Sequence, residues 1–167
     1  MFRIISLFLL SFNVYAINCK NHPIFCQIKK NKPDIDIQYA MKLSNYISIY
    51  SHKYKVEARL YTAILAQESQ YDMSARSYSD GLNDALEPIR AYQDYGLIQV
   101  SYKTAEVFKI DLKRLMTDME YAVESGAIIL KNKIKECSFL GKDAWVCYHS
   151  KTESYRGVYK SLVMKYY

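Results

Sequence analysis

Glu68 is the side chain of this sequence best placed for acid–base chemistry. It stands at the C-terminal end of an apolar helical stretch, one turn after Ile64 and Leu65 and directly before a polar segment. We expect such a carboxyl group to be half-buried, and burial raises its pKa because it disfavours the charged form. A general acid that works near neutral pH needs a raised pKa. Glu68 is therefore the candidate general acid, and a solvated glutamate at a helix end is the alternative that this feature alone leaves open.

The elements that must position Glu68 are predicted to be helices. Apolar residues recur with helical spacing on both sides of it, and the stretch from Thr117 to Glu120 has the spacing of a capping box at a helix start. The 167 residues include 5 Gly and 3 Pro, too few for a sandwich or barrel of many hairpins. The predicted fold class is all-α, with helices over 34–50, 56–69, 102–108, 111–116, 117–135, 142–149 and 152–166.

Residues 70–95 interrupt the helical pattern. They show no sustained period, contain Gly81, Asn83 and Pro88, and are rich in Ser, Asp and Tyr. This composition predicts a long surface loop with at most one short helical turn. Loops of this length are usually functional or disordered. The role of its central part, residues 78–93, is open at this stage.

The first sixteen residues have the features of a secretory signal peptide. Arg3 precedes an apolar run over 4–12, and Val14-Tyr15-Ala16 has the small-x-small spacing of a cleavage site. The run is about nine residues long, whereas a spanning helix needs about 20, so a membrane anchor is the less favoured alternative. We expect cleavage of residues 1–16, a single domain over 17–167 with no membrane span, and a periplasmic location.

The cysteines follow the expected cleavage site and are even in number: Cys19, Cys26, Cys137 and Cys147. In an exported protein this favours disulfides. Four cysteines allow three pairings, and proximity in the sequence favours joining the first two and the last two. A zinc site is disfavoured, because neither the cysteines nor the three histidines have the close paired spacing of zinc ligands. We expect no metal and no organic cofactor.

Four short motifs together resemble the lytic transglycosylase family. In chain order they are AILAQESQYD over 63–72, DYGLIQV over 94–100, AIIL over 127–130 and CYHS over 147–150. The resemblance is to the soluble-transglycosylase, goose-lysozyme-like catalytic domains that cut bacterial peptidoglycan, and it covers about 55–166. Each motif is weak alone, but the four in this order are specific. The fold implied is a lysozyme-like helical domain with a long loop between the catalytic helix and the Gly-Leu-Ile-Gln motif.

The resemblance implies a role for individual residues. Glu68 matches the family's catalytic acid. The expected substrate-binding residues are Ser77, in the loop after it, Tyr95, Gly96 and Gln99, in the motif that floors the sugar groove, and Tyr148, which reaches toward the catalytic carboxylate or the sugar's acetamido group. His149 replaces the Asn that usually follows this tyrosine. That replacement is similar to the small secretion- and conjugation-associated branch of the family.

One glutamate suffices for the reaction that the resemblance implies. Ordinary glycosidases use two carboxylates, but the 2-acetamido oxygen of N-acetylmuramic acid (MurNAc) can replace the second one. Glu68 would protonate the bridging oxygen and then accept the proton of the 6-hydroxyl. Asp72, four residues after Glu68, is assigned a capping or loop role, since the resemblance places it just past the helix end. Other aspartates of the loop are possible second carboxylates that spacing does not separate: Asp80, Asp84 and Asp94.

The predicted function is that of an exported peptidoglycan lytic transglycosylase. It would cleave the bond between MurNAc and N-acetylglucosamine (GlcNAc), leave a 1,6-anhydroMurNAc end, and open the wall locally for a secretion, conjugation or pilus system. The alternatives are a muramidase of the same fold, which is a hydrolase, and a non-catalytic peptidoglycan-binding scaffold protein. Loss of Arg3 with the signal lowers the net charge from +6 to +5. A basic exported monomer fits an anionic wall polymer better than nucleic acid.

Overall fold

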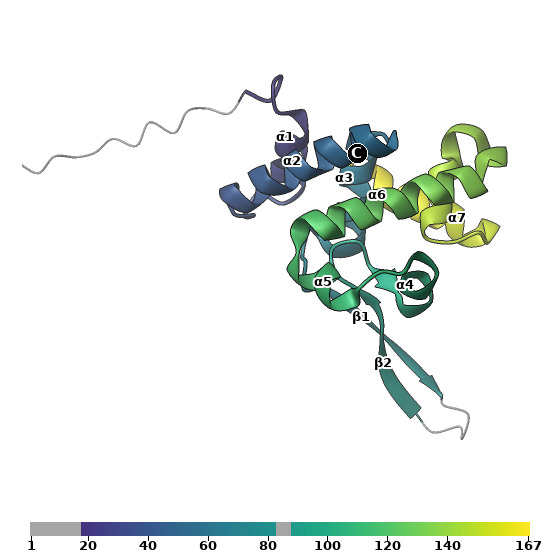
Figure 1. Ribbon diagram of the computed structural model, residues 1–167. Coiled ribbons are helices and arrows are strands. Elements are labelled where there is room, and N and C mark those ends of the chain that lie inside the picture. Colours follow the sequence, from purple (N-terminus) through teal and green to yellow (C-terminus); the bar gives the residue numbers. More distant parts are fainter. Residues whose placement is uncertain (1–17, 83–87) are drawn as a thin grey trace, which may run out of the picture.

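Helices form the body of the protein, and a β-hairpin projects from it (Figure 1). The computed structural model describes residues 18–82 and 88–167, so the expected signal peptide lies outside the described residues. The elements are α1 Pro23–Asn31, α2 Ile37–Tyr54, α3 Ala58–Ser69, β1 Arg76–Leu82, β2 Pro88–Tyr95, β3 Val100–Ser101, α4 Tyr102–Phe108, α5 Leu112–Thr117, α6 Met119–Glu136, the 3-10 helix η1 Ser138–Tyr148, and α7 Glu153–Met164. Within this part of the chain, no helix is both long and apolar enough to cross a membrane.

Helix α3 is the centre of the core. All its side chains from Tyr61 to Ala66 are buried, and α1, α2 and α7 pack against it. The carboxylate of Glu57 caps its start by accepting the backbone N–H groups of Arg59 and Leu60. Gln70, in the left-handed conformation at φ 53°, ends the helix. The last turn, which carries Glu68, is therefore held in place by a buried helix with defined ends.

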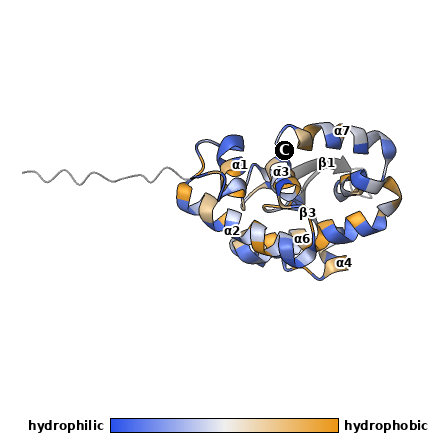
Figure 2. Cartoon of the chain, turned by 90° about the horizontal axis from the view of Figure 1, so that it is seen from above, coloured by the Kyte–Doolittle hydropathy of each residue, from blue (hydrophilic) through white to orange (hydrophobic). Residues whose placement is uncertain are grey.

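The outer helices are amphipathic. Figure 2 shows hydrophilic and hydrophobic residues mixed along α2, α6 and α7. In α6 the buried residues include Ala122, Ser125, Gly126 and Ile129, which recur every three or four positions and so lie on one face. This face of α6 packs against α2 and η1 and closes the core opposite α3.

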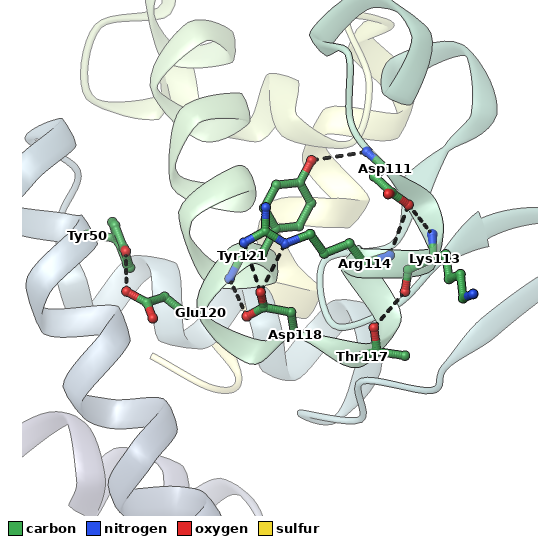
Figure 3. A network of polar contacts seen from close by, with 8 residues as sticks. All are labelled: Tyr50, Asp111, Lys113, Arg114, Thr117, Asp118, Glu120 and Tyr121. Carbon is green, nitrogen blue, oxygen red and sulfur yellow. Dashed lines mark hydrogen bonds and ion pairs between the residues drawn. The ribbon is translucent and has the colours of Figure 1, made fainter.

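A polar network fixes the start of α6 to its neighbours (Figure 3). The carboxylate of Asp118 accepts the N–H of Tyr121 and an ion pair from Arg114 of α5, at 3.1 and 3.0 Å. The Tyr50 hydroxyl of α2 donates to Glu120 at 2.7 Å. The sequence prediction of a capping box led by Thr117 is wrong. Thr117 is the last residue of α5, where its hydroxyl donates to a carbonyl of that helix, and Asp118 is the cap.

The segment predicted to be a long loop contains a β-hairpin. β1 and β2 pair antiparallel from Arg76 opposite Tyr95 to Leu82 opposite Pro88, and β3 adds to β2 in the order β1-β2-β3. Pro88 is the first residue of β2, a position where a strand tolerates the missing N–H. The Ser and Asp residues of the segment are typical of loops, so its composition does not indicate strands. The helical body is as predicted, but this connection contains two paired strands.

Two further local predictions need correction, while the disulfides are confirmed. The first helix predicted from the sequence starts at residue 34, but α1 precedes it and starts at Pro23, a favoured residue in a first helical turn. The helix expected over 142–149 is the 3-10 helix η1, interrupted by Gly141 at φ 57°. The bridges are Cys19–Cys26 and Cys137–Cys147, with Cα atoms 5.6 and 6.4 Å apart. They clamp the start of α1 and the η1 segment.

Candidate active site

A groove of about 500 Å³ opens beside the C-terminal end of α3. Its walls come from α3, the hairpin, β3, α4, α6, η1 and α7. The groove brings together four residues that the sequence assigned to the site, although they are spread over 81 positions: Glu68, Ser77, Gln99 and Tyr148. Tyr95 and Gly96, which were also assigned to substrate binding, do not line it.

Glu68 is half-buried in this groove, as its place in the sequence predicts. Burial raises its pKa from 4.5 to about 7; a hydrogen bond from Tyr159 works against this rise, and the negative charge of Asp94 adds to it. The Tyr159 hydroxyl donates to Oε1 of Glu68 at 2.6 Å. A carboxyl group that titrates near pH 7 can both give a proton and take one back under physiological conditions.

Tyr159 is the site residue that the sequence reasoning missed. That reasoning allowed Tyr148 to bond Glu68, but the Tyr148 hydroxyl donates to the carbonyl of Ile98 at 2.7 Å, and Tyr159 bonds Glu68 instead. Tyr148 still lines the groove. The signal in the sequence was the i, i+4 pair of Tyr159 and Val163, the buried positions of α7. A buried tyrosine needs a partner for its hydroxyl, and here the partner is the candidate acid.

The Gly-Leu-Ile-Gln motif forms a tight turn between β2 and β3. Gly96 has φ +74°, and a Cβ there would lie 3.3 Å from the carbonyl oxygen of Leu115, so glycine is needed for both conformation and space. The side-chain amide of Gln99 donates to the carbonyls of Gly96 and Ala75, at 2.8 and 3.2 Å. The turn is therefore braced from within by Gln99, which at the same time lines the groove.

Residues 45–156 match the family model described as the Transglycosylase SLT domain. The chain belongs to this family. It is accordingly a peptidoglycan lytic transglycosylase with a lysozyme-like fold, as its motifs predict. The matched range contains Glu68, the hairpin, the Gly-Leu-Ile-Gln turn and Tyr148, and it ends three residues before Tyr159. Comparisons with curated proteins and with solved structures give no significant match.

Two aromatic rings pack against the ring of Tyr159. His149, in place of the expected Asn, stacks on the Tyr159 ring with centroids 4.8 Å apart and planes at 12°. Trp145 meets the same ring at 6.1 Å. His149 itself lines the groove. These contacts fix the phenol ring whose hydroxyl bonds Glu68, so His149 supports the site by packing.

Tyr95, which the sequence assigned to substrate binding, and Asp72, to which it assigned a loop role, both make structural contacts. Tyr95 pairs with both neighbouring strands and packs edge-on against Tyr102, with centroids 5.9 Å apart. Asp72 accepts the N–H and the hydroxyl of Ser74, each at 2.8 Å, which is the loop role predicted for it. Tyr95 and Asp72 thus serve the frame of the site, and neither lines the groove.

The structure separates the three loop aspartates of this transglycosylase. The backbone of Asp80 lies opposite that of Arg90 in the hairpin, and Asp84 lies outside the described residues. Asp94 lines the groove, and its Oδ2 accepts the hydroxyl of Ser77 at 2.8 Å. Asp94 is thus the candidate for a second carboxylate whose side chain the structure describes, and it lies in the groove with Glu68.

Proposed function

We propose that this transglycosylase cleaves the MurNAc–GlcNAc bond of peptidoglycan with Glu68 as the acid and then the base, and leaves a 1,6-anhydroMurNAc end. The observation that carries the proposal is the half-buried Glu68 carboxyl in the groove, with a pKa near 7 and a hydrogen bond from a buried tyrosine. A single group in this condition can serve both proton transfers.

The first step breaks the glycosidic bond. Protonated Glu68 gives its proton to the bridging oxygen, which leaves as the 4-hydroxyl of GlcNAc, while the acetamido oxygen of MurNAc forms a bond to the anomeric carbon. In the second step the 6-hydroxyl oxygen attacks that carbon and the acetamido oxygen leaves. The Glu68 carboxylate takes the 6-hydroxyl proton, so water is not consumed. Tyr159 occupies Oε1 throughout and leaves Oε2 for the substrate.

Digestion of purified peptidoglycan by the wild type and by Glu68→Gln tests this proposal, with mass analysis of the released muropeptides. We expect anhydro ends from the wild type and almost no release by Glu68→Gln, because the amide has nearly the same shape and cannot act as the acid. Reducing ends, heavier by one water molecule, would identify a muramidase. Absence of any product from folded wild-type protein would favour the scaffold alternative.

We also propose that the enzyme is exported by residues 1–16, acts in the periplasm and opens the wall locally for a secretion, conjugation or pilus apparatus. The support is the signal-like N-terminus, two disulfide bridges of the kind that persist in oxidising compartments, and the Tyr-His-Ser motif. In the native host, we expect the periplasmic protein to begin at Ile17. Deletion should impair assembly of such an apparatus, and a copy carrying Glu68→Gln should fail to restore it.

A further inference from the structure

We propose that Asp94 is a second catalytic carboxylate, which accepts the acetamido N–H of MurNAc and stabilises the positive charge that this group acquires during the reaction. The inference rests on the proposed function, because it assigns a role within the same acetamido-assisted reaction. It gives the groove two carboxylates with different tasks.

The backbone places Asp94 at a rigid point of the groove. Asp94 is the next-to-last residue of β2 and pairs with Ser101 of β3, while the following residue, Tyr95, pairs with both β1 and β3. The carboxylate is half-buried and lines the groove together with Glu68. Catalytic groups are held more accurately by strands than by loops. Asp94 therefore has the fixed position that a group acting on the transition state requires.

One oxygen of Asp94 is held and the other is left for a ligand. Ser77 of β1 donates its hydroxyl to Oδ2 at 2.8 Å, which fixes the orientation of the carboxylate. Among the described residues, no lysine or arginine forms a salt bridge with Asp94, and Oδ1 has no hydrogen-bond donor. The described residues thus give this carboxylate no ion-pair partner, so a substrate that develops positive charge can supply one.

The charge of Asp94 acts on the reacting groups. It raises the pKa of Glu68, and it contributes to raising the pKa of Tyr148, which lines the same groove. The negative charge of Asp94 thus favours the protonated form of Glu68, which is the form that the first step of the reaction requires. The electrostatic effect agrees with the geometry, because both carboxyl groups line a single groove.

Asp94 can assist this reaction without forming a covalent bond to the substrate. When the acetamido oxygen attacks the anomeric carbon, the nitrogen lone pair moves into the forming ring and its N–H becomes cationic. A carboxylate that accepts this N–H stabilises the cation. When the 6-hydroxyl oxygen displaces the acetamido oxygen, the nitrogen recovers its lone pair and the charge disappears. Asp94 therefore neither gains nor loses a proton, and the interaction is strongest in the charged intermediate and the transition states beside it.

Asp94→Asn tests the proposal, because it keeps the shape and a partner for Ser77 but removes the charge. On defined glycan oligomers we expect kcat to fall about 100-fold, the scale of a lost electrostatic contact to a transition state, with unchanged glycan affinity. The alkaline limb of the kcat/KM profile should move to lower pH, since a like charge near Glu68 is gone. Glu106→Gln is the matched control: it removes one carboxylate from the exposed face of α4, outside the groove, and should leave kcat unchanged.

A second variant keeps the test decisive if Asp94→Asn does not fold. Ser77→Ala retains the charge and removes the bond that orients it, and we expect an intermediate loss of kcat. Wild-type kcat in folded Asp94→Asn, or in Ser77→Ala where only that variant folds, would overturn the inference. If Glu68→Gln is inactive in the same assay, the proposed function stands without it. Activity in Glu68→Gln would instead overturn the proposed function itself.

Discussion

The bond from Tyr159 to Glu68 leads to a quantitative prediction about pH. Tyr159→Phe removes the hydroxyl that donates to Oε1 of Glu68 at 2.6 Å and keeps the ring that packs against His149 and Trp145. Because the bond stabilises the charged form, it lowers the pKa of Glu68, while burial raises that pKa to about 7. Without the hydroxyl, burial acts unopposed by this bond and the pKa rises further.

The size of the rise follows from the energy of the bond. A hydrogen bond to a charged group contributes about 1.5 to 3 kcal/mol. Since about 1.4 kcal/mol corresponds to one pKa unit, the pKa of Glu68 in Tyr159→Phe is expected at roughly 8 to 9. The enzyme needs protonated Glu68 as its acid, so the variant should stay active at a higher pH than the wild type does.

The assay is the pH profile of kcat/KM on soluble glycan oligomers, whose alkaline limb reports the pKa of the acid in the free enzyme. Tyr148→Phe is the matched control, because its hydroxyl bonds the carbonyl of Ile98 and not Glu68. Its alkaline limb should stay within a few tenths of a pH unit of the wild type, even if kcat falls. An unmoved limb in Tyr159→Phe, or an equal movement in both variants, would refute the reasoning.

Three further predictions concern stability. Gly126→Ala puts a Cβ 2.7 Å from Cγ2 of Ile98 and should lower the free energy of unfolding, measured by urea titration, by about 1 to 3 kcal/mol. In Gly157→Ala the new Cβ has no atom within 4 Å, and the same measurement should show a rise of roughly 0.5 to 1 kcal/mol. Replacing both cysteines of the Cys137–Cys147 bridge by alanine should cost about 2 to 3 kcal/mol, and an unchanged melting temperature would contradict this. Because the pKa of Glu68 in the folded protein is raised from 4.5 to about 7, the free energy of unfolding of the wild type falls as pH rises between these values. From pH 4 to pH 8, Glu68→Gln should therefore gain up to about 3 kcal/mol in free energy of unfolding relative to the wild type. A difference between the two proteins that does not depend on pH would contradict the raised pKa.

The features that the sequence predicts well depend on local pattern. Helix α3 and the position of Glu68 at its end follow from apolar spacing over a few turns. Both disulfides join cysteines at most ten positions apart, so proximity identifies them. The four short motifs lead to the family because their residues and order are specific, even without knowledge of where the chain turns.

The features that the sequence misses depend on tertiary contacts. The bond between Tyr159 and Glu68 joins residues 91 positions apart. The spacing of Tyr159 and Val163 indicates a buried face of α7, but it does not indicate that Tyr159 meets the acid. The hairpin is stabilised by pairing between strands, which outweighs the loop-like Ser and Asp content of each strand read alone. Asp94 becomes distinct from the other loop aspartates once β3 pairs with its strand.

Residues 166 and 167, which follow α7, are bonded to the first and third helices. The side-chain amides of Gln27 and Asn31 in α1 both donate to the backbone carbonyl of Tyr166 at 2.9 Å, across 139 and 135 positions. Arg59 at the start of α3 donates to the backbone oxygen of Tyr167. While a ribosome still holds residues 166 and 167, these donors lack their acceptors, although α1 can already pack against α2 and α3. These three contacts of the fold therefore form after α7 has been synthesised, and until then α1 is held by its remaining contacts alone.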